Sequence, residues 1–256
     1  MTSAFLKKLL RFLQLFLLLI VLLELGYYFI LLPYTSLATI EVNTVLSLTE
    51  EQVLRMSALQ LPISYFEVQP KELEKNMEKF FRIRKAHVRK KFPRTLIIDL
   101  EERKPLAIVL GAVISGKVLP GLLDEEGVIF EVGSTMSAWD LPVISGMRLS
   151  VLSLGSQVST EMLPFLADLY QCRLQYPDVY AQISEYSILK TMRHYEVLMY
   201  PRQQLLPVRL SLPLNYYHFK QALPVLRTVL SYNNPSSFDE LDYRGELAVL
   251  KGEYNG

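Results

Sequence analysis

The sequence predicts an α+β protein with an N-terminal transmembrane helix, a small β-α-α-β-β domain, and a larger, mixed β-rich domain that contains two helices. Three observations lead to this prediction. A continuous apolar run occupies residues 12–32, a compact alternation of strand-like and helix-like segments covers residues 37–104, and short apolar runs split by glycines fill residues 105–252. Two folded domains are therefore expected to follow one membrane segment.

The apolar run from Phe12 to Leu32 has the length and composition of a transmembrane helix. Its 21 residues would span about 31 Å at the helical rise, enough to cross the hydrocarbon core of a bilayer. Three basic residues precede the run and none follows it closely, so residues 1–11 are expected in the cytoplasm and the rest outside. A cleaved signal peptide is the alternative, but its apolar core would be shorter and would end at a small-residue site.

Glu24 lies inside this apolar run, where an ionised carboxylate is unfavourable. Acidic residues at such depth often contact another transmembrane helix, and this is one hypothesis for Glu24. The alternative has equal weight: Glu24 is protonated, or its side chain reaches toward the membrane interface.

The segment after the anchor is expected to fold as a strand followed by two helices. Thr39–Asn43 alternates in polarity as a short strand does. Thr49 and Gln52 have the spacing of a capping box, and Pro70 suits the first turn of the second helix. The apolar residues at helical spacing in this second helix are Leu73, Met77, Phe80 and Phe81.

A basic run, "RIRKAHVRKKFPR", leads directly into the apolar and acidic run "TLIIDLEE". Strand alternation places Ala86 and Val88 on one face and the basic residues on the other, and it separates Leu96 from Asp99 in the same way. The basic strand would then lie antiparallel to an acidic one. We therefore interpret the run as the solvated face of a hairpin rather than a site for polyanions.

Order and spacing of these motifs resemble a POTRA domain of the FtsQ/DivIB family of bacterial cell-division proteins. The run "VRKKFPRTLIIDLEERKPLA" matches the segment that closes the POTRA hairpin in that family and enters the next domain. The matching residues with a structural role in the family motif are Phe92, Pro93, Glu102, Arg103 and Pro105. The resemblance implies a POTRA-type domain over residues 37–104 and an FtsQ/DivIB-type β domain over residues 105–252.

The second domain reads as strand-rich, with helices expected at about residues 160–175 and 215–230. The sequence "DEEG" at Asp124–Gly127 is typical of a hairpin connection, and its acids are expected to be solvated. The final segment "FDELDYRGELAVLK" is expected to supply one or two strands.

Composition limits the possible functions. The chain has 27 Lys and Arg against 26 Asp and Glu, which weakens a nucleic-acid function, because such a function normally needs a domain-wide positive field. Cys172 is the only cysteine, which excludes an internal disulfide and a multi-cysteine metal site. We expect no nucleic acid, no cofactor, no metal and no small-molecule substrate.

Residues with catalytic potential are sparse. The three histidines, His87, His194 and His218, do not fall at metal-ligand spacing. Ser187 and Lys190 fit the pattern S-x-x-K of penicillin-recognising serine enzymes, which requires a helix to bring the two groups together. Their segment reads as a strand, which would point them to opposite faces, so no catalytic residues are expected.

The resemblance implies a non-enzymatic, single-pass scaffold of the division site in the cell (inner) membrane. Its partners would be FtsB/FtsL-like division proteins and, through them, the septal peptidoglycan machinery. In the family, the partner-binding edge follows a D-L-R sequence near the C-terminus, which corresponds here to Asp242, Tyr243 and Arg244. Arg244 is expected to pair with a partner carboxylate. The strand edge is expected to comprise Glu246, Leu247, Ala248, Val249 and Leu250.

Other interpretations stay open at this point. The last strand could be an interior strand, with Arg244 paired inside the domain. A POTRA-bearing module that handles polypeptides in secretion or outer-membrane assembly is the alternative function, although the chain has neither POTRA repeats nor a barrel pattern. An extracytoplasmic hydrolase would rest on Ser187 and Lys190 alone.

Overall fold

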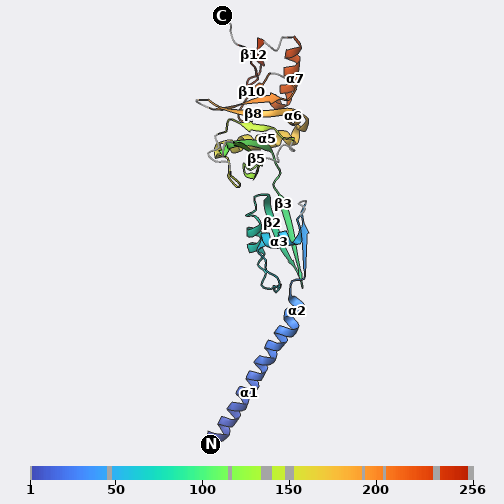
Figure 1. The fold of residues 1–256 in the computed structure, drawn as a ribbon, viewed down its shortest axis with the longest axis vertical. Coiled ribbons are helices and arrows are strands. Elements are labelled where there is room, and N and C mark those ends of the chain that lie inside the picture. Colours follow the sequence, from blue (N-terminus) through green and yellow to red (C-terminus); the bar gives the residue numbers. More distant parts are fainter. Residues whose placement is uncertain are drawn as a thin grey trace. The chain divides into compact units, whose positions relative to one another are not determined.

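The structure is a computed structural model, and its chain forms two compact units, Met1–Glu102 and Arg103–Gly256 (Figure 1). The residues that it describes are 2–44, 48–114, 117–133, 140–147, 153–191, 194–203, 206–232 and 237–252.

An apolar helical segment opens the first unit. Helix α1 (Thr2–Gly26) is followed by a π-helical turn, η1 (Tyr27–Leu31), and a short helix, α2 (Leu32–Thr35). Within the described residues, Lys8–Phe29 is one helical stretch long and apolar enough to cross a membrane. The side chain of Glu24 is exposed on α1.

The remainder of the first unit is a three-stranded sheet with two helices, as the sequence predicts. Strand β3 (Thr95–Glu102) lies in the middle, parallel to β1 (Thr39–Asn43) and antiparallel to β2 (Ile83–Lys91). Helices α3 (Glu50–Ser57) and α4 (Pro70–Met77) complete the β-α-α-β-β order. Their core consists of apolar side chains from every one of these elements and from the connecting segments.

The local signals act as expected in this unit, with one exception. Thr49 and Gln52 form the predicted capping box of α3, and Pro70 lies in the first turn of α4. Helix α4 ends at Met77, however, so Phe80 and Phe81 follow it instead of continuing its apolar face. Both phenyl rings are exposed, because the chain turns there to enter β2.

The structure confirms the predicted hairpin, in which the basic strand β2 lies antiparallel to the acidic strand β3. Ala86 and Val88 are buried, whereas Arg89 pairs with Asp99 across the strands at 2.6 Å and Arg84 pairs with Glu101 at 3.2 Å. Hydrogen bonds from Asn43 and Arg89 lower the pKa of Asp99 below its usual range. Much of the local basic charge therefore faces acidic side chains of the same domain.

The second unit contains a mixed β-sheet. Within the described residues this sheet has nine strands, in the order β12-β11-β10-β9-β8-β7-β4-β5-β6. The first strands are β4 (Ala107–Ile114), β5 (Lys117–Leu123), β6 (Ile129–Val132) and β7 (Val143–Ser145). The later strands are β8 (Ile183–Lys190), β9 (Tyr195–Pro201), β10 (Val208–Ser211), β11 (Glu240–Asp242) and β12 (Val249–Lys251).

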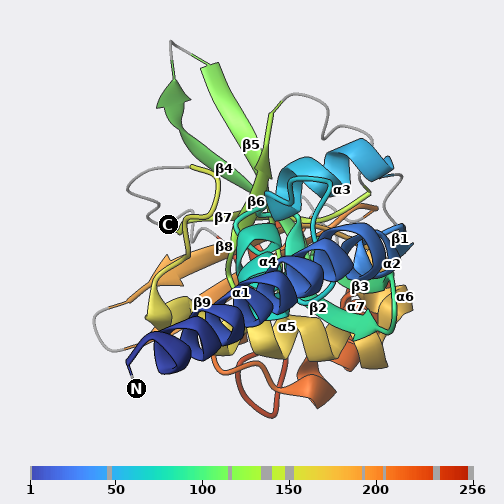
Figure 2. The ribbon, with the colours of Figure 1, turned by 90° about the horizontal axis from the view of Figure 1, so that it is seen from below.

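Two main helices accompany this sheet, close to the predicted ranges. They are α5 (Leu163–Gln175), which a 3-10 turn, η3 (Thr160–Met162), precedes, and α7 (Tyr216–Tyr232). A short helix that the sequence did not predict, α6 (Pro177–Ala181), follows α5. In Figure 2 the β4–β5 hairpin extends away from α5 and α7.

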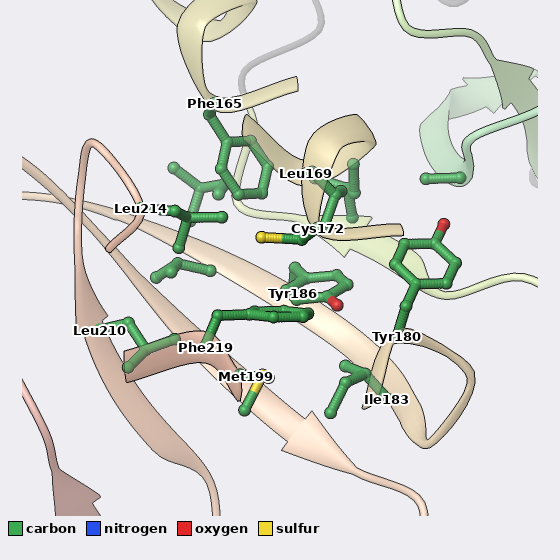
Figure 3. Close-up of a cluster of buried hydrophobic side chains, with 14 of the residues drawn as sticks. Phe165, Leu169, Cys172, Tyr180, Ile183, Tyr186, Met199, Leu210, Leu214 and Phe219 are labelled. Atoms are coloured by element: carbon green, nitrogen blue, oxygen red, sulfur yellow. The ribbon is translucent and has the colours of Figure 1, made fainter. Parts of the chain in front are cut away.

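The main core of the second unit lies between these helices and one face of the sheet. Figure 3 shows Tyr186 of β8 among Leu169 and Cys172 of α5 and Phe219 of α7, all of which are fully buried. Burial raises the pKa of the Cys172 thiol to about 12, so this cysteine is a packing residue without an accessible thiolate. A second, smaller apolar cluster among the described residues contains Leu122 and Phe130.

Arg103, a residue of the family motif, is held by the acidic hairpin Asp124–Gly127. Its guanidinium pairs with the Asp124 carboxylate and, at 2.7 Å, with Glu126. Asp124 is 1 % exposed, so the prediction that this acid is solvated was wrong. The hairpin turns its first acid inward, where backbone N–H groups of Glu126 and Val128 also donate to it.

We expect Arg103→Ala to lower the free energy of unfolding by about 2 kcal/mol, because it leaves the buried Asp124 carboxylate without a cation. Two backbone N–H groups still donate to the Asp124 carboxylate in this variant, so the loss of stability should be smaller than for a buried carboxylate with no hydrogen-bond donor. Urea unfolding of the full chain in mild detergent measures the change. Arg55→Ala is the control, since Arg55 and Glu51 are both largely exposed and should contribute less than about 1 kcal/mol. Equal effects of the two changes would contradict this account.

Candidate partner-binding edge

Two of the four sheet edges are already covered. At one end of the large sheet, Ile129 of β6 donates to Ser156 at 2.9 Å and accepts from Gly155 at 2.7 Å. In the first unit, the β2 edge is covered by α4: the N–H groups of Val88 and Ala86 donate to Glu74 and Glu78, at 2.8 and 3.2 Å. Pairing or acidic side chains thus block strand addition at both places.

The other two edges, β1 and β12, have no strand on their outer side among the described residues. They differ in what lies beside them. No large apolar side chain of β1 is exposed, whereas Val249 of β12 is 53 % exposed and Leu247, just before it, is 79 % exposed. An uncovered edge with exposed apolar side chains is the feature that a partner strand could use, and it is found at β12.

The observed edge strand, β12, begins later in the chain than the sequence predicts. We expected an edge over Glu246–Leu250, but β12 begins at Val249 and runs to Lys251. It pairs antiparallel with β11, through Val249 with Asp242 and Lys251 with Glu240. The chain has to reverse between these two strands, so the residues from Arg244 to Leu247 form a bend. Ala248 and Leu250 pack against the core, while Glu246 is exposed.

Arg244 pairs inside its own domain. Its guanidinium donates to both carboxylate oxygens of Asp242, at 2.8 and 2.6 Å, and also to Glu196 of β9. The arginine thus connects the start of the bend to two strands of the sheet. About a third of its side chain remains exposed.

Arg244 belongs to a network that we call the C-terminal ionic cluster. Its members are Glu196, Arg209, Glu240, Asp242, Arg244 and Lys251. Arg209 of β10 lies at its centre and reaches Glu196 at 2.8 Å and Glu240 at 2.6 Å. Lys251 of β12 reaches Asp242 at 2.6 Å. Charges therefore alternate across β9, β10, β11 and β12 and hold the edge strand to the sheet.

The pKa values of the cluster follow from its geometry. Burial alone would raise the pKa of Glu196, which is 2 % exposed, but hydrogen bonds from Arg209, His194 and Arg244 outweigh it and hold the pKa at about 2. The hydrogen bonds of Arg244 lower the pKa of Asp242 well below its usual range, and the same pairing raises the pKa of Arg244. Both carboxylates are therefore ionised at neutral pH.

An open groove of about 410 Å³ lies beside β12. Its lining includes Asp242 and Arg244 of the ionic cluster and the exposed residues Leu247 and Val249. His194, whose imidazole is 2.8 Å from Glu196, also lines it. The groove thus combines charged groups with apolar side chains directly at the uncovered edge.

Arg244 and Asp242 were named from the sequence, but Glu196, which also holds Arg244, and Arg209, which holds Glu196, were not. Glu196 and Arg209 are single charges inside otherwise apolar strands, "YEVLMY" and "PVRLSL". Such isolated charges require partners when a strand is buried, and this signal could have marked both residues. The sequence alone could not predict that Glu196 and Arg209 lie close together, because their proximity depends on the pairing of β9 with β10.

The described residues show no arrangement for the hydrolase alternative. Strand β8 contains Ser187 and Lys190 on opposite faces of the sheet. Lys190 lies instead 3.8 Å from Glu161 and over the ring of Tyr195. In the part of the chain that the structure describes, no three His, Cys, Asp or Glu side chains gather as potential metal ligands.

Fold and edge together define a protein with a candidate membrane anchor, a POTRA-type β-α-α-β-β domain and a larger β-rich domain. Residues 35–103 match the family described as "POTRA domain, FtsQ-type". This match covers the POTRA-type domain and supports the resemblance of that domain to the FtsQ/DivIB family. No curated protein matches the chain. The apolar helix and the FtsQ-type domain fit a single-pass protein of the inner membrane.

Proposed function

We propose that this protein is a non-enzymatic scaffold of the divisome that binds FtsB/FtsL-like partners by strand addition to β12. The observation that carries this proposal is the edge of β12, which no described strand covers, in a sheet whose opposite edge, at β6, is paired. A partner segment in extended conformation would gain main-chain hydrogen bonds along this edge and would extend the sheet.

The side chains around the edge suit such a partner. Leu247 and Val249 offer apolar surface beside the strand, and an extended partner can place alternate side chains against them. The exposed part of Arg244 can meet a partner carboxylate while Asp242 keeps the guanidinium oriented. Pre-orientation of this kind reduces the entropy that is lost on binding.

The proposal also includes the arrangement of the chain at the membrane. Residues 1–11 lie in the cytoplasm, residues 12–32 cross the inner membrane, and the POTRA-type domain (37–104) and the β domain (105–252) lie outside it at the division septum. The basic residues ahead of the apolar run support this orientation. Through its partners the scaffold would act on the septal peptidoglycan machinery without chemistry of its own.

Val249→Pro is expected to weaken binding of an FtsB-like ectodomain to the full chain at least about tenfold. Proline removes the N–H of the edge residue and disturbs the strand to which the partner would add. Calorimetric titration of the protein in nanodiscs measures the affinity, and circular dichroism verifies that the variant is folded.

Val249→Ala is the matched control, since it truncates the same side chain but retains the main-chain N–H. A small loss for alanine and a large loss for proline would indicate main-chain recognition. Unchanged affinity in a folded proline variant would rule out strand addition at β12, and equal losses for both would place recognition in the side chain.

A further inference from the structure

One end of the three-stranded sheet carries an exposed aromatic group that neither the core nor the proposed partner edge uses. We call Tyr65, Phe66 and Phe92 the aromatic end. Phe92 lies in the β2–β3 turn and is 64 % exposed, and Phe66, in the segment before α4, is 62 % exposed. Large apolar rings exposed together usually mark an interaction surface.

Contacts through Tyr65 hold these rings together. Its ring meets Phe66 at 5.5 Å and Phe92 at 5.8 Å between centroids, both nearly edge to face. The ammonium group of Lys90 lies 4.6 Å from the centre of the Tyr65 ring and donates to the Val68 carbonyl at 3.0 Å. The aromatic end is therefore a defined surface with a cation at its side.

The same surface is fastened to the chain that leaves the membrane anchor. Tyr65 donates its N–H to the carbonyl of Thr35 at 2.8 Å, Ser64 pairs with Ser36, and Arg94 donates to the Ser36 carbonyl at 3.1 Å. The candidate membrane span ends at Phe29 by its helical hydropathy and at Leu32 in the proposed topology, so three to six residues separate it from Thr35. Six residues reach at most about 20 Å when extended and about 9 Å as a helix.

We propose that the aromatic end rests on the lipid headgroups of the membrane that the anchor crosses, with its rings at the interface. The tether, which is the short segment between the membrane span and Thr35, leaves the surface within reach of the bilayer, because it is at most six residues long. Tyrosine is favoured at the membrane–water interface, and phenylalanine rings are buried at the boundary between headgroups and acyl chains in interfacial helices, so both kinds of ring suit this depth.

The charges around the aromatic end suit an anionic surface to a modest degree. Three basic residues border it, Lys90, Lys91 and Arg94, against two acids, Glu41 and Glu67. Lys91 is 3.9 Å from Glu41, and Glu67 accepts from the N–H of Ser64 at 3.4 Å. The aromatic rings therefore supply most of the attraction, and the basic residues add to it near lipid phosphates.

This contact would limit the tilting of the POTRA-type domain on its tether. It needs the anchor but not the division role or any partner at β12, so it goes beyond the proposed function and can fail independently. It also assigns a role to the end of the basic strand that the hairpin pairing leaves unexplained.

The test places tryptophan at Phe66 or Phe92 in the full chain, reconstituted in vesicles of phosphatidylcholine and phosphatidylglycerol. Lipids with bromine near the headgroup end of their acyl chains quench tryptophan at the interface. The signal of Trp139, the only tryptophan of the chain, is subtracted with the unchanged protein. We expect quenching at both positions to be at least about twofold stronger than at the control position.

The control is Phe81→Trp, at the opposite end of the same sheet. Phe81 is also exposed and lies before β2, about 25 Å along the strands from the aromatic end. All three changes replace one exposed aromatic ring with another, which keeps the fold. Quenching that is equal at the three positions, or absent at both Phe66 and Phe92, would overturn the proposal.

Discussion

Phe219→Ala is expected to lower the free energy of unfolding by about 4 kcal/mol, because it empties a fully enclosed site in the core of the second unit. Phe219 is 0 % exposed and belongs to the cluster that joins α7 to α5 and the sheet (Figure 3). The surrounding side chains come from several elements and cannot collapse together into the space that the ring leaves. Urea unfolding of the full chain in mild detergent, followed by circular dichroism, measures the loss.

The matched control for this change is Tyr217→Ala, two residues earlier on the same helix. Its ring is 63 % exposed, so its removal should change stability by less than about 1 kcal/mol. Similar losses for the two variants would mean that helix α7 does not pack through Phe219 as described.

Arg209→Ala is expected to destabilise the second unit by about 3 kcal/mol and to release β11 and β12 from the sheet. The change leaves the buried carboxylate of Glu196 with fewer donors and leaves Glu240 without its bidentate partner. Removal of one member from a buried ion pair strands the charge of the other, which is the reason for the large effect. We expect partner binding at β12 to fall with it, since the edge loses its support.

The pH dependence of the unchanged protein tests the same network. In the folded protein the pKa of Glu196 is about 2, below the value of about 4.3 that is usual for a glutamate. The ionised carboxylate therefore stabilises the fold fully above about pH 5, and this contribution is lost as the pH falls from about 5 to 2. For a buried group this amounts to about 2–3 kcal/mol. In Arg209→Ala this acid-dependent loss should be smaller. Arg209→Lys, which keeps the charge but not the bidentate geometry, should lie between the two. An identical pH profile in Arg209→Ala would contradict the role of the cluster.

Local signals predicted the POTRA-type domain closely. The capping box at Thr49, the proline at the start of α4 and the alternation in β2 and β3 depend on residues that are near one another in sequence. The end of α4 was harder to predict, because the apolar residues Phe80 and Phe81 continue the helical period although the chain has already turned.

The candidate site was predictable only in part. Arg244 and the apolar residues near Leu247 and Val249 follow from the family resemblance, and the structure places them at the groove beside β12. The start of β12 was placed three residues too early, because the reversal after β11 consumes residues whose composition is typical of a strand. The intradomain partners of Arg244 were not predicted, since Glu196 lies 48 residues away from it in the chain.

The sequence by itself determined the apolar segment that is a candidate membrane span, the fold class and the family resemblance, because these depend on composition, periodicity and short-range spacing. Only the tertiary structure decided which strand edges are covered, which charges meet in the C-terminal ionic cluster, and that the aromatic end lies beside the tether. These features arise from pairings between distant segments, such as β10 with β11 and Ser36 with Ser64. A hydrogen bond or an ion pair acts only over a few ångströms, so what a side chain does is settled when the fold brings its partner within that distance.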